Sequence, residues 1–414
     1  MNYRITQSAY KGSISAPASK SYLQRAVILA AMAEGVSIIS NYTQNEDTGV
    51  ILNAVNTMGA SASHNGNHLK IRGGIKRNIP WTFHCNESGL AARMLCALSV
   101  LNENNVIVTG SGSLMQRPMN MVAETLKACG KKVVTNNNCL PFEISGKINV
   151  SEFRSSGIQT SQFITGLLIA LPLYQDETVL HVDGLKSKPY IELTLDLISQ
   201  FGLIVENENL TQFRIPGRQH ASPVSVSAEC DWSGAAFHLV GAAIAGDVEL
   251  TGLDINSRQA DKTVMQVLKD CGANCDISEK SIRVKKEKLM AFNFDACDCP
   301  DLVPPLAVLA ANCKGISKIK GTDRLQFKES NRAEAIISEF SKLGIKVENS
   351  DNTLIIHGSE ITGGTVLSHN DHRIAMALAI MGLKASSPVT IEGMECISKS
   401  YPGFIKDFEF LLLF

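Results

Sequence analysis

One pattern recurs along the chain at a nearly constant interval, and it limits the possible folds more than any other feature. Each copy reads as an amphipathic helix, a glycine, a valine-rich strand, a polar turn and a second strand, as in AETLKACGKKVV and the FEISG that follows it. A glycine directly after a helix is typical of a left-handed C-cap. The fixed interval predicts a repeat architecture. The evenly spaced glycines are Gly59, Gly130, Gly202, Gly272 and Gly344.

Each unit also contains a second helix that is apolar nearly all round, for example AVILAAMA and FITGLLIALPL. A helix without a polar face is expected to be buried. With the strands around them, the two helices give six βαβαββ units and an α/β fold. A chain of 414 residues exceeds one ordinary core, so we expect two domains. The six apolar helices are predicted to begin near Ser21, Ser88, Ser161, Ser233, Asp301 and Asp371.

Charge and composition exclude several classes of protein. The formal net charge is -1, which argues against a general nucleic-acid binder or a membrane-surface protein. Residues 1–12 are polar, and the longest apolar stretches are shorter than the roughly 20 residues of a membrane span. We therefore expect a cytoplasmic protein. The 11 cysteines include Cys271/Cys275 and Cys297/Cys299, but the spacing and the absence of a close His favour buried thiols over zinc.

Cationic side chains occupy equivalent loops of the units, at the starts of the apolar helices or after the following strands. Any single one is best explained as a solvated surface charge, and N-capping explains Ser88 and Ser233. Neither explanation accounts for a whole set in one register. Because Arg and Lys bind carboxylates and phosphates, the set predicts a site for more than one multiply charged anion. Its members are Lys20, Arg25, Arg117, Lys328, Arg332, Arg373 and Lys399.

Three further residues of these loops are candidates for proton transfer. Asp301 precedes an apolar helix, and Glu329 lies between Lys328 and Arg332. His372 could move a proton or only donate a hydrogen bond. The only glycine-rich candidate is a lone G-x-G at residues 110–112, which is best explained as a turn. The sequence therefore predicts acid–base chemistry on anions without a metal or cofactor.

Eight short motifs resemble successive motifs of the EPSP synthase (3-phosphoshikimate 1-carboxyvinyltransferase) family, in the family's order. The pair K-E-S-x-R and D-H-R-x-A-M is the most specific. The motifs extend over residues 17–402, nearly the full chain. They are PASKSYLQRA from Pro17, SGLAAR from Ser88, QRP from Gln116, SQF from Ser161, SKPYI from Ser187, KESNR from Lys328, NDHRIAM from Asn370 and KSYP from Lys399.

The resemblance implies a two-domain, inside-out α/β barrel, with buried helices, sheets outside and three units in each domain. One domain is expected at residues 18–228, and the other at residues 1–17 with 229–414. The active site is expected in the interdomain cleft, and the protein is expected to act as a monomer.

The resemblance also implies the reaction. The enolpyruvyl group of phosphoenolpyruvate passes to the 5-hydroxyl of shikimate 3-phosphate, and phosphate leaves a tetrahedral intermediate. Asp301 matches the base and Glu329 the acid, with Lys20 and His372 beside them. The shikimate 3-phosphate residues are Lys20, Ser21, Arg25, Thr160, Ser161, Gln162, Ser187, Tyr190, Asp301, Arg324 and Lys328, and the phosphoenolpyruvate residues are Lys20, Gly89, Arg117, Gln162, Arg332, Arg373 and Lys399.

The sequence departs from the family pattern at a few positions, none of which carries a charged catalytic group. These departures put substrate affinity and inhibitor sensitivity in doubt. They are Ala18 for Gly, Glu87 for Asn, Leu90 for Thr, Thr160 for Ser and Asn331 for Asp.

Two other functions are consistent with parts of the pattern. The sister transferase that acts on UDP-N-acetylglucosamine has Lys-Asn where this chain has Lys20-Ser21, and usually a reactive Cys in the loop that corresponds to residues 110–118. This chain has no Cys in that loop. A non-catalytic anion-binding protein would not be expected to retain Asp301 and Glu329. A phosphate-release assay with each acceptor distinguishes the three.

Overall fold

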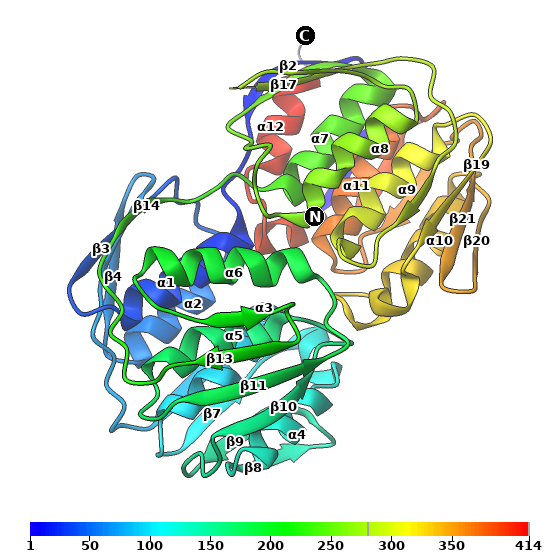
Figure 1. Cartoon of the computed structure of the whole chain (residues 1–414). Helices are drawn as coiled ribbons and strands as arrows, with labels where there is room; N and C mark the ends of the chain where they lie inside the picture. The colour runs from blue at the N-terminus through cyan, green and yellow to red at the C-terminus, as the bar shows by residue number, and fades with distance from the viewer. Residues whose placement is uncertain (280, 413–414) are drawn as a thin grey trace. The chain divides into compact units, whose positions relative to one another are not determined.

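The computed structural model describes residues 1–279 and 281–412. The chain divides into two compact units (Figure 1). Unit 1 consists of Met1–Ser19 with Glu229–Phe414, and unit 2 of Lys20–Ala228. Unit 1 is therefore assembled from both ends of the chain. Among the described helices, none has the length and apolar character that a membrane crossing requires.

Among the described residues, each unit contains three small mixed sheets, and five of these six sheets share one topology. A parallel pair is followed by antiparallel neighbours, as the βαβαββ pattern predicts. In unit 2 the sheet orders are β14 (Ser225–Ser227), β3 (Val36–Ser40), β5 (His68–Arg72), β4 (Ser61–Asn65); β6 (Trp81–His84), β7 (Val106–Thr109), β9 (Cys139–Ser145), β8 (Lys132–Asn136); and β10 (Glu152–Ser156), β11 (Thr178–Asp183), β13 (Gln212–Ile215), β12 (Glu206–Glu208).

In unit 1, two sheets have four strands and the third has three. The sequence predicts six βαβαββ repeats, and the sixth repeat differs from this pattern. Its parallel pair β22–β23 is completed by β1, which comes from the other end of the chain and pairs antiparallel with β23. The orders are β2 (Tyr10–Ser15), β15 (Gly246–Thr251), β17 (Ser281–Lys285), β16 (Asn274–Ile277); β18 (Asn293–Asp295), β19 (Ile316–Lys320), β21 (Thr353–His357), β20 (Val347–Ser350); and β22 (Gly364–Leu367), β23 (Val389–Glu392), β1 (Asn2–Ile5).

The strands β2 and β14 show where the chain passes between the units. β2 lies early in the sequence, yet it pairs in parallel with β15 of unit 1. β14 is the last strand of unit 2 along the chain, and it completes the sheet that contains β3, the first. Beside these strands, Ala18 and Cys230 form an antiparallel bridge. The two passages of the chain are therefore adjacent.

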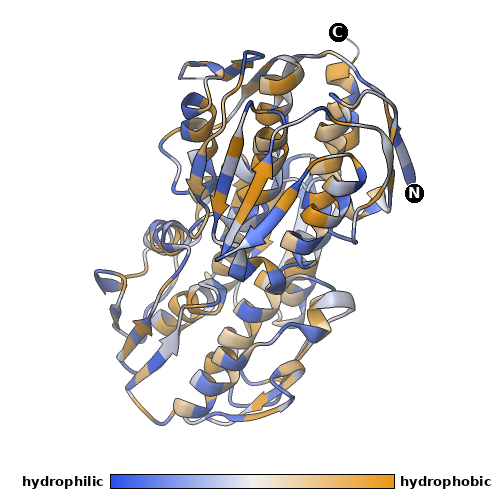
Figure 2. Ribbon diagram, turned by 90° about the vertical axis from the view of Figure 1, so that its right-hand side faces the viewer, coloured by the Kyte–Doolittle hydropathy of each residue, from blue (hydrophilic) through white to orange (hydrophobic). Residues whose placement is uncertain are grey.

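The six apolar helices are present and buried, which confirms that part of the prediction. Hydrophobic residues are concentrated along the helices of both units (Figure 2). Every residue of α3, α9 and α11 is buried. Removing so much apolar surface from water is the main stabilising contribution to each core. The helices are α1 (Lys20–Met32), α3 (Gly89–Leu98), α5 (Gln162–Ala170), α7 (Trp232–Ala245), α9 (Val303–Ala311) and α11 (His372–Gly382).

The amphipathic helices are the other half of the repeat. The five predicted glycines all have left-handed φ angles between 75° and 100°, so their role as C-caps is confirmed. A further amphipathic helix, α12, follows in the sixth unit. The helices are α2 (Glu46–Thr57), α4 (Asn120–Ala128), α6 (Lys188–Gln200), α8 (Val264–Asp270), α10 (Arg332–Lys342) and α12 (Phe404–Leu412).

Short 3₁₀ turns lead into several of these helices and carry the polar loops. Asp301 lies in one of them, η5, immediately before α9, rather than on the helix itself. The turns are η1 (Ser99–Leu101), η2 (Gly112–Gln116), η3 (Leu171–Leu173), η4 (Ala260–Thr263), η5 (Pro300–Leu302), η6 (Thr322–Phe327) and η7 (Met394–Lys399).

Candidate active site

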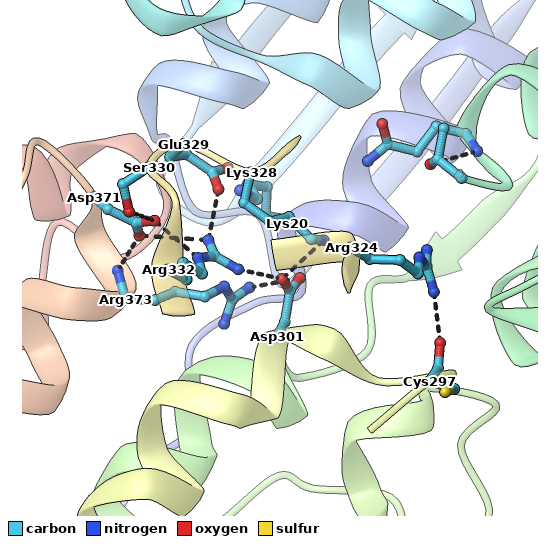
Figure 3. Close-up of polar contacts among 12 residues, drawn as sticks. Lys20, Cys297, Asp301, Arg324, Lys328, Glu329, Ser330, Arg332, Asp371 and Arg373 are labelled. Carbon is cyan, nitrogen blue, oxygen red and sulfur yellow. Dashed lines mark hydrogen bonds and ion pairs between the residues drawn. The ribbon is translucent and has the colours of Figure 1, made fainter. Parts of the chain in front are cut away.

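A carboxylate surrounded by cations lies at the N-terminal end of α9 in unit 1 (Figure 3). Asp301 Oδ1 accepts from Arg332 Nη1 at 2.6 Å and from Lys328 Nζ at 3.2 Å. Its other oxygen, Oδ2, lies 3.2 Å from Arg373 Nη2. The three cations come from the η6–α10 loop and from the start of α11, so residues far apart in sequence meet at one carboxyl group.

The guanidinium of Arg332 connects this carboxylate to two others. Arg332 Nη2 donates to Glu329 Oε2 at 2.6 Å, and Arg332 Nε donates to Asp371 Oδ2 at 2.8 Å. Arg332 and Asp371 are both fully buried. Asp371 also accepts from Ser330 Oγ and caps α11 through the backbone N–H of Arg373. Arg332 is thus the common partner of three acids, one of which has no access to water.

The electrostatic balance at Asp301 favours its ionised form. Burial alone would raise the pKa of Asp301, but Arg373, Lys328 and Arg332 outweigh it and hold the pKa well below its usual range. For Arg332, burial favours the neutral form, but Asp371, Glu329 and Asp301 reverse this and raise its pKa. Burial lowers the pKa of Lys328, with Asp301 opposing it. The cluster is therefore a set of mutually stabilised charges.

Three other predicted residues of unit 1 lie on neighbouring segments. Lys399, at the end of η7, donates to the backbone oxygen of Asn370 at 2.7 Å. His372 is the first residue of α11 and is buried. Arg324 donates to the backbone oxygen of Cys297, shortly before η5. Burial lowers the pKa of Arg324, while Asp301 opposes that effect.

Arg25 is the centre of a second polar cluster, in unit 2. It is buried within α1 and donates from Nε to Thr194 Oγ1 at 2.9 Å and from Nη2 to Thr165 Oγ1 at 3.3 Å. Its guanidinium carbon lies 5.8 Å from the ring centroid of Tyr190. Burial lowers the pKa of Arg25 to about 10, which still leaves it charged at neutral pH. A buried cation held by hydroxyl groups is suited to bind an anionic group.

Gly89, at the start of α3, lies among several polar side chains. A methyl group on Gly89 would be 2.7 Å from Arg93 Nη1 and 3.1 Å from Arg117 Nη1, with Gln162 Oε1 at 3.8 Å. Arg93 Nη1 donates to Gln162 Oε1 at 3.1 Å. Arg117 donates to Ser113 Oγ at 2.8 Å, and its buried Nε has no partner among the described residues. A side chain at this position would crowd both guanidinium groups, so their present arrangement depends on glycine.

The remaining predicted residues lie around the same helix starts. Lys20 Nζ forms an ion pair with Asp47 Oδ2 at 2.9 Å. Ser21 accepts from Arg25 through its backbone oxygen, and Thr160 Oγ1 accepts from the backbone N–H of Gln162. Ser161 and Ser187 are the N-cap residues of α5 and α6, and Ser187 has a left-handed backbone.

The predicted residues of unit 1 therefore lie around Asp301 or on neighbouring segments, and those of unit 2 lie in separate clusters around Arg25, around Gly89 and at Lys20. Three acidic or basic residues of these clusters were given no role from the sequence: Asp47, Arg93 and Asp371. Arg93 lies within the SGLAAR motif, and Asp47 and Asp371 lie in the charged loops, so the motif and the loops were the available signals. In the sequence, N-capping accounts for Asp371 at the start of a helix. Its hydrogen bond to Arg332 could not be predicted, because that partner lies 39 residues away.

Comparison with known proteins identifies the family of the chain. The model of the family described as EPSP synthase (3-phosphoshikimate 1-carboxyvinyltransferase) matches residues 5–408. A protein of Clostridium novyi named 3-phosphoshikimate 1-carboxyvinyltransferase is 38% identical over 420 residues, with 99% of this chain and 97% of the relative covered. A protein of the same name from Clostridium kluyveri is 38% identical over 410 residues, with 98% and 96% covered.

Solved structures show the same fold. An EPSP synthase from Acinetobacter baumannii superimposes with a TM-score of 0.83 at 26% identity, with 100% of this chain and 98% of that chain covered. The enolpyruvyl transferase NikO from Streptomyces tendae has a TM-score of 0.80 at 18% identity, a likeness of fold alone, with 99% and 96% covered. Since the family model matches nearly the whole chain and named relatives exceed a third identity, the chain belongs to the EPSP synthase (3-phosphoshikimate 1-carboxyvinyltransferase) family of transferases.

Proposed function

We propose that this member of the family transfers the enolpyruvyl group of phosphoenolpyruvate to the 5-hydroxyl of shikimate 3-phosphate by addition and elimination. One observation carries the proposal: a single buried guanidinium, Arg332, contacts both Asp301 and Glu329. The addition needs one carboxyl group to take a proton from the acceptor and another to give a proton to the methylene carbon. Two acids on one cation are suited to that pair of tasks.

The two substrates are assigned by the match of the motifs. Shikimate 3-phosphate is bound by Lys20, Ser21, Arg25, Thr160, Ser161, Gln162, Ser187, Tyr190, Asp301, Arg324 and Lys328. Phosphoenolpyruvate is bound by Lys20, Gly89, Arg117, Gln162, Arg332, Arg373 and Lys399. The two sets draw residues from both units. The finer architecture we propose is an inside-out barrel in each domain, with helices inside and sheets outside.

Asp301 can act as a base only when its cations are drawn away. As long as Arg332, Arg373 and Lys328 surround it, the low pKa of Asp301 makes it a weak proton acceptor. Phosphoenolpyruvate brings a carboxylate and a phosphate that compete for Arg332 and Arg373. Their binding relaxes the hold on Asp301 and raises its proton affinity when the acceptor hydroxyl is in place. The substrate thereby switches on the base that deprotonates its partner.

The binding of phosphoenolpyruvate to Arg332 also releases Glu329 from that guanidinium. Before the substrate binds, the Glu329 carboxylate accepts from Arg332 at 2.6 Å. When Arg332 turns to phosphoenolpyruvate, Glu329 can carry the proton that goes to the methylene carbon. The cationic centre that forms is captured by the acceptor oxygen, which gives the tetrahedral intermediate. In the elimination the methyl group loses a proton as the C–O bond to phosphate breaks, and the departing phosphate is stabilised by Lys20, Arg117 and Lys399. His372, buried beside Arg373, assists proton transfer to the leaving group.

The location and the partners that we propose for the protein are those that suit its substrates. Both are small, anionic, water-soluble metabolites, so we place the protein in the cytoplasm, acting as a monomer and without a metal or cofactor. Nucleic acid and membranes are not expected partners, in keeping with the net charge of -1.

Acceptor choice is the test of the proposed function. With phosphoenolpyruvate present, the protein should release inorganic phosphate when shikimate 3-phosphate is added and should not when UDP-N-acetylglucosamine is added. The reason is the Arg25 guanidinium beside Tyr190, which the hydroxyl groups of Thr165 and Thr194 hold in place. We assign this preorganised cation to shikimate 3-phosphate. Turnover with UDP-N-acetylglucosamine instead would show that the protein is the sister transferase. No turnover with either acceptor would favour a non-catalytic anion-binding protein.

Replacing Gly89 by Ala should weaken phosphoenolpyruvate binding selectively. The added methyl group would be 2.7 Å from Arg93 Nη1 and 3.1 Å from Arg117 Nη1, so a guanidinium or the ligand has to move. We expect the KM for phosphoenolpyruvate to rise by roughly one order of magnitude, because a misplaced binding group of this kind costs up to about 10²-fold. The KM for shikimate 3-phosphate should change little. Steady-state kinetics with each substrate varied in turn measures both.

Gly49→Ala is the matched control for this substitution. Gly49 lies within α2, and a methyl group there has no neighbour within 4 Å. Its kinetics should stay close to those of the parent protein. A KM for phosphoenolpyruvate that is unaltered in Gly89→Ala would remove Gly89 from the proposed site.

A further inference from the structure

A second buried carboxylate, outside the residues assigned so far, lies on the helix that begins with Arg332. Glu339 is located two turns along α10, and its side chain is 1% exposed. Five hydrogen bonds reach it: from Lys342 to both oxygens, from Ser338, from the backbone N–H of Leu367, and from His369 Nε2. A buried carboxylate is tolerated only when its lone pairs are satisfied in this way.

Two of those donors do not belong to α10. Leu367 N–H reaches Glu339 Oε2 at 2.9 Å, and His369 Nε2 reaches Oε1 at 2.8 Å. Leu367 is the last residue of β22, and His369 lies in the segment that leads from β22 into α11. Lys342, by contrast, is three residues from Glu339 on the same helix, and its side chain is 46% exposed. The carboxylate of Glu339 therefore connects α10 to the segment that precedes Asp371.

That segment has an unusual backbone. His369 and Asn370 both adopt left-handed conformations, with φ angles of 54° and 55°. His and Asn adopt this region more readily than most residues, and two consecutive residues in it give the segment a defined turn that neighbouring contacts help to hold. Glu339 holds His369 from one side, and Lys399 donates to the backbone oxygen of Asn370 at 2.7 Å. Asp371, the next residue, then points to Arg332 and caps α11.

Helix α10 thus meets this segment at two places. At its first residue, Arg332 Nε donates to Asp371 Oδ2 at 2.8 Å. Two turns further on, Glu339 accepts from Leu367 and His369. A connection at one place would leave the segment free to turn about it, whereas two connections fix its orientation. The position of Asp371, and through it that of Arg332 beside Asp301 and Glu329, depends on both.

We propose that Glu339 and His369 are positioning residues for the transfer reaction, which hold the segment before α11 so that Asp371 orients the Arg332 guanidinium toward phosphoenolpyruvate. The inference rests on the proposed function. Neither residue contacts the reacting groups. The alternative is that the pair only stabilises the fold.

The first variant is His369→Asn. Asn is well tolerated at left-handed φ angles, so the backbone is preserved, but its shorter amide cannot reach Glu339. We expect the kcat/KM for phosphoenolpyruvate to fall about tenfold, since a small displacement of a binding group has effects of this order. The dissociation constant of shikimate 3-phosphate alone, from calorimetry, should remain nearly unchanged, because Arg25 and its hydroxyl partners belong to unit 2.

His369→Gln is the rescue variant. Its longer amide presents an N–H near the position of His Nε2, so the bond to Glu339 can form again. We expect it to recover most of the kcat/KM for phosphoenolpyruvate. The matched control is Lys342→Met, which removes another donor to the same carboxylate but leaves both connections to the segment. It should retain full activity.

The results separate the possible roles. If the parent protein catalyses the transfer and His369→Asn has the same kcat/KM for phosphoenolpyruvate, the positioning role is wrong. The same holds if Lys342→Met loses as much activity as His369→Asn, or if Gln does not restore what Asn removes. If the parent protein shows no turnover with shikimate 3-phosphate, the proposed function fails, and thermal melting of the same variants then shows whether the pair stabilises the fold alone.

Discussion

Replacing Glu329 by Gln is expected to lower kcat by about 10²- to 10⁴-fold, the usual contribution of a general acid or base. The substitution keeps the size of the side chain and removes its exchangeable acid proton. Glu329 is bound to Arg332, which belongs to the phosphoenolpyruvate set, so shikimate 3-phosphate affinity should be nearly unchanged. Exchange of solvent deuterium into the methylene group of phosphoenolpyruvate should slow in parallel, because that exchange requires reversible protonation at carbon.

Two comparisons make this result specific. Glu334→Gln changes an exposed carboxylate in the first turn of α10, the helix that follows Glu329. It should leave kcat and the rate of deuterium exchange unchanged. Asp301→Asn should also lower kcat but should weaken acceptor binding as well, since it removes an oxygen that we assign to the acceptor's hydroxyl groups. If Glu329 only holds its loop through Arg332, Glu329→Gln will lower the melting temperature and retain most of its activity. The role of proton donor would then have to be withdrawn.

Replacing Arg332 by Met is expected to cost about 3–5 kcal/mol of the free energy of unfolding, the typical loss when one partner of a buried ion pair is removed. Asp371 is fully buried and accepts from Arg332 Nε at 2.8 Å, so the substitution leaves a negative charge without its main cation. The variant should also lose transferase activity in its folded fraction, because Arg332 is assigned to the binding of phosphoenolpyruvate. Urea titration of the parent and variant, followed by far-UV circular dichroism, measures the stability.

Arg283→Met is the matched control for this loss of stability. Arg283 forms an equally short bidentate pair with Asp247, at 2.7 and 2.8 Å, but its side chain is 49% exposed. An exposed pair contributes little to stability, so the control should unfold close to the parent protein. Adding Asp371→Asn to Arg332→Met should recover part of the loss, because it removes the stranded charge. Equal losses in the two Arg variants would show that burial of the pair does not matter.

The features that could be predicted from the sequence are those fixed by short stretches of chain. The glycines that follow the amphipathic helices have left-handed φ angles because a helix end alone requires them. The apolar helices are buried because no face of them is polar. The group formed by Asp301, Lys328, Arg332 and Arg373 follows from the repeat register, which puts equivalent loops at one end of the buried helices.

The features that could not be predicted depend on partners distant in sequence. Nothing in the residues around Asn2–Ile5 shows that β1 completes the sixth sheet, since its partner β23 lies near the other end of the chain. Asp371 reads as an ordinary N-cap, and only the fold brings the Arg332 side chain to it. Glu339 reads as a surface residue of an amphipathic helix, because its burial depends on the segment that crosses it.

The assembly of unit 1 from two separated parts of the chain also has a consequence during synthesis. The segment with β1 and β2 is synthesised before unit 2, but β15, the partner of β2, follows only after the whole of unit 2. At the usual pace of translation, that segment waits on the order of tens of seconds for a sheet to join. Unit 2 is complete by Ala228 and can fold during this interval. During this interval the nascent chain carries two β-forming strands whose sheet partners have not yet been made, and exposed strand edges of this kind can pair with other chains.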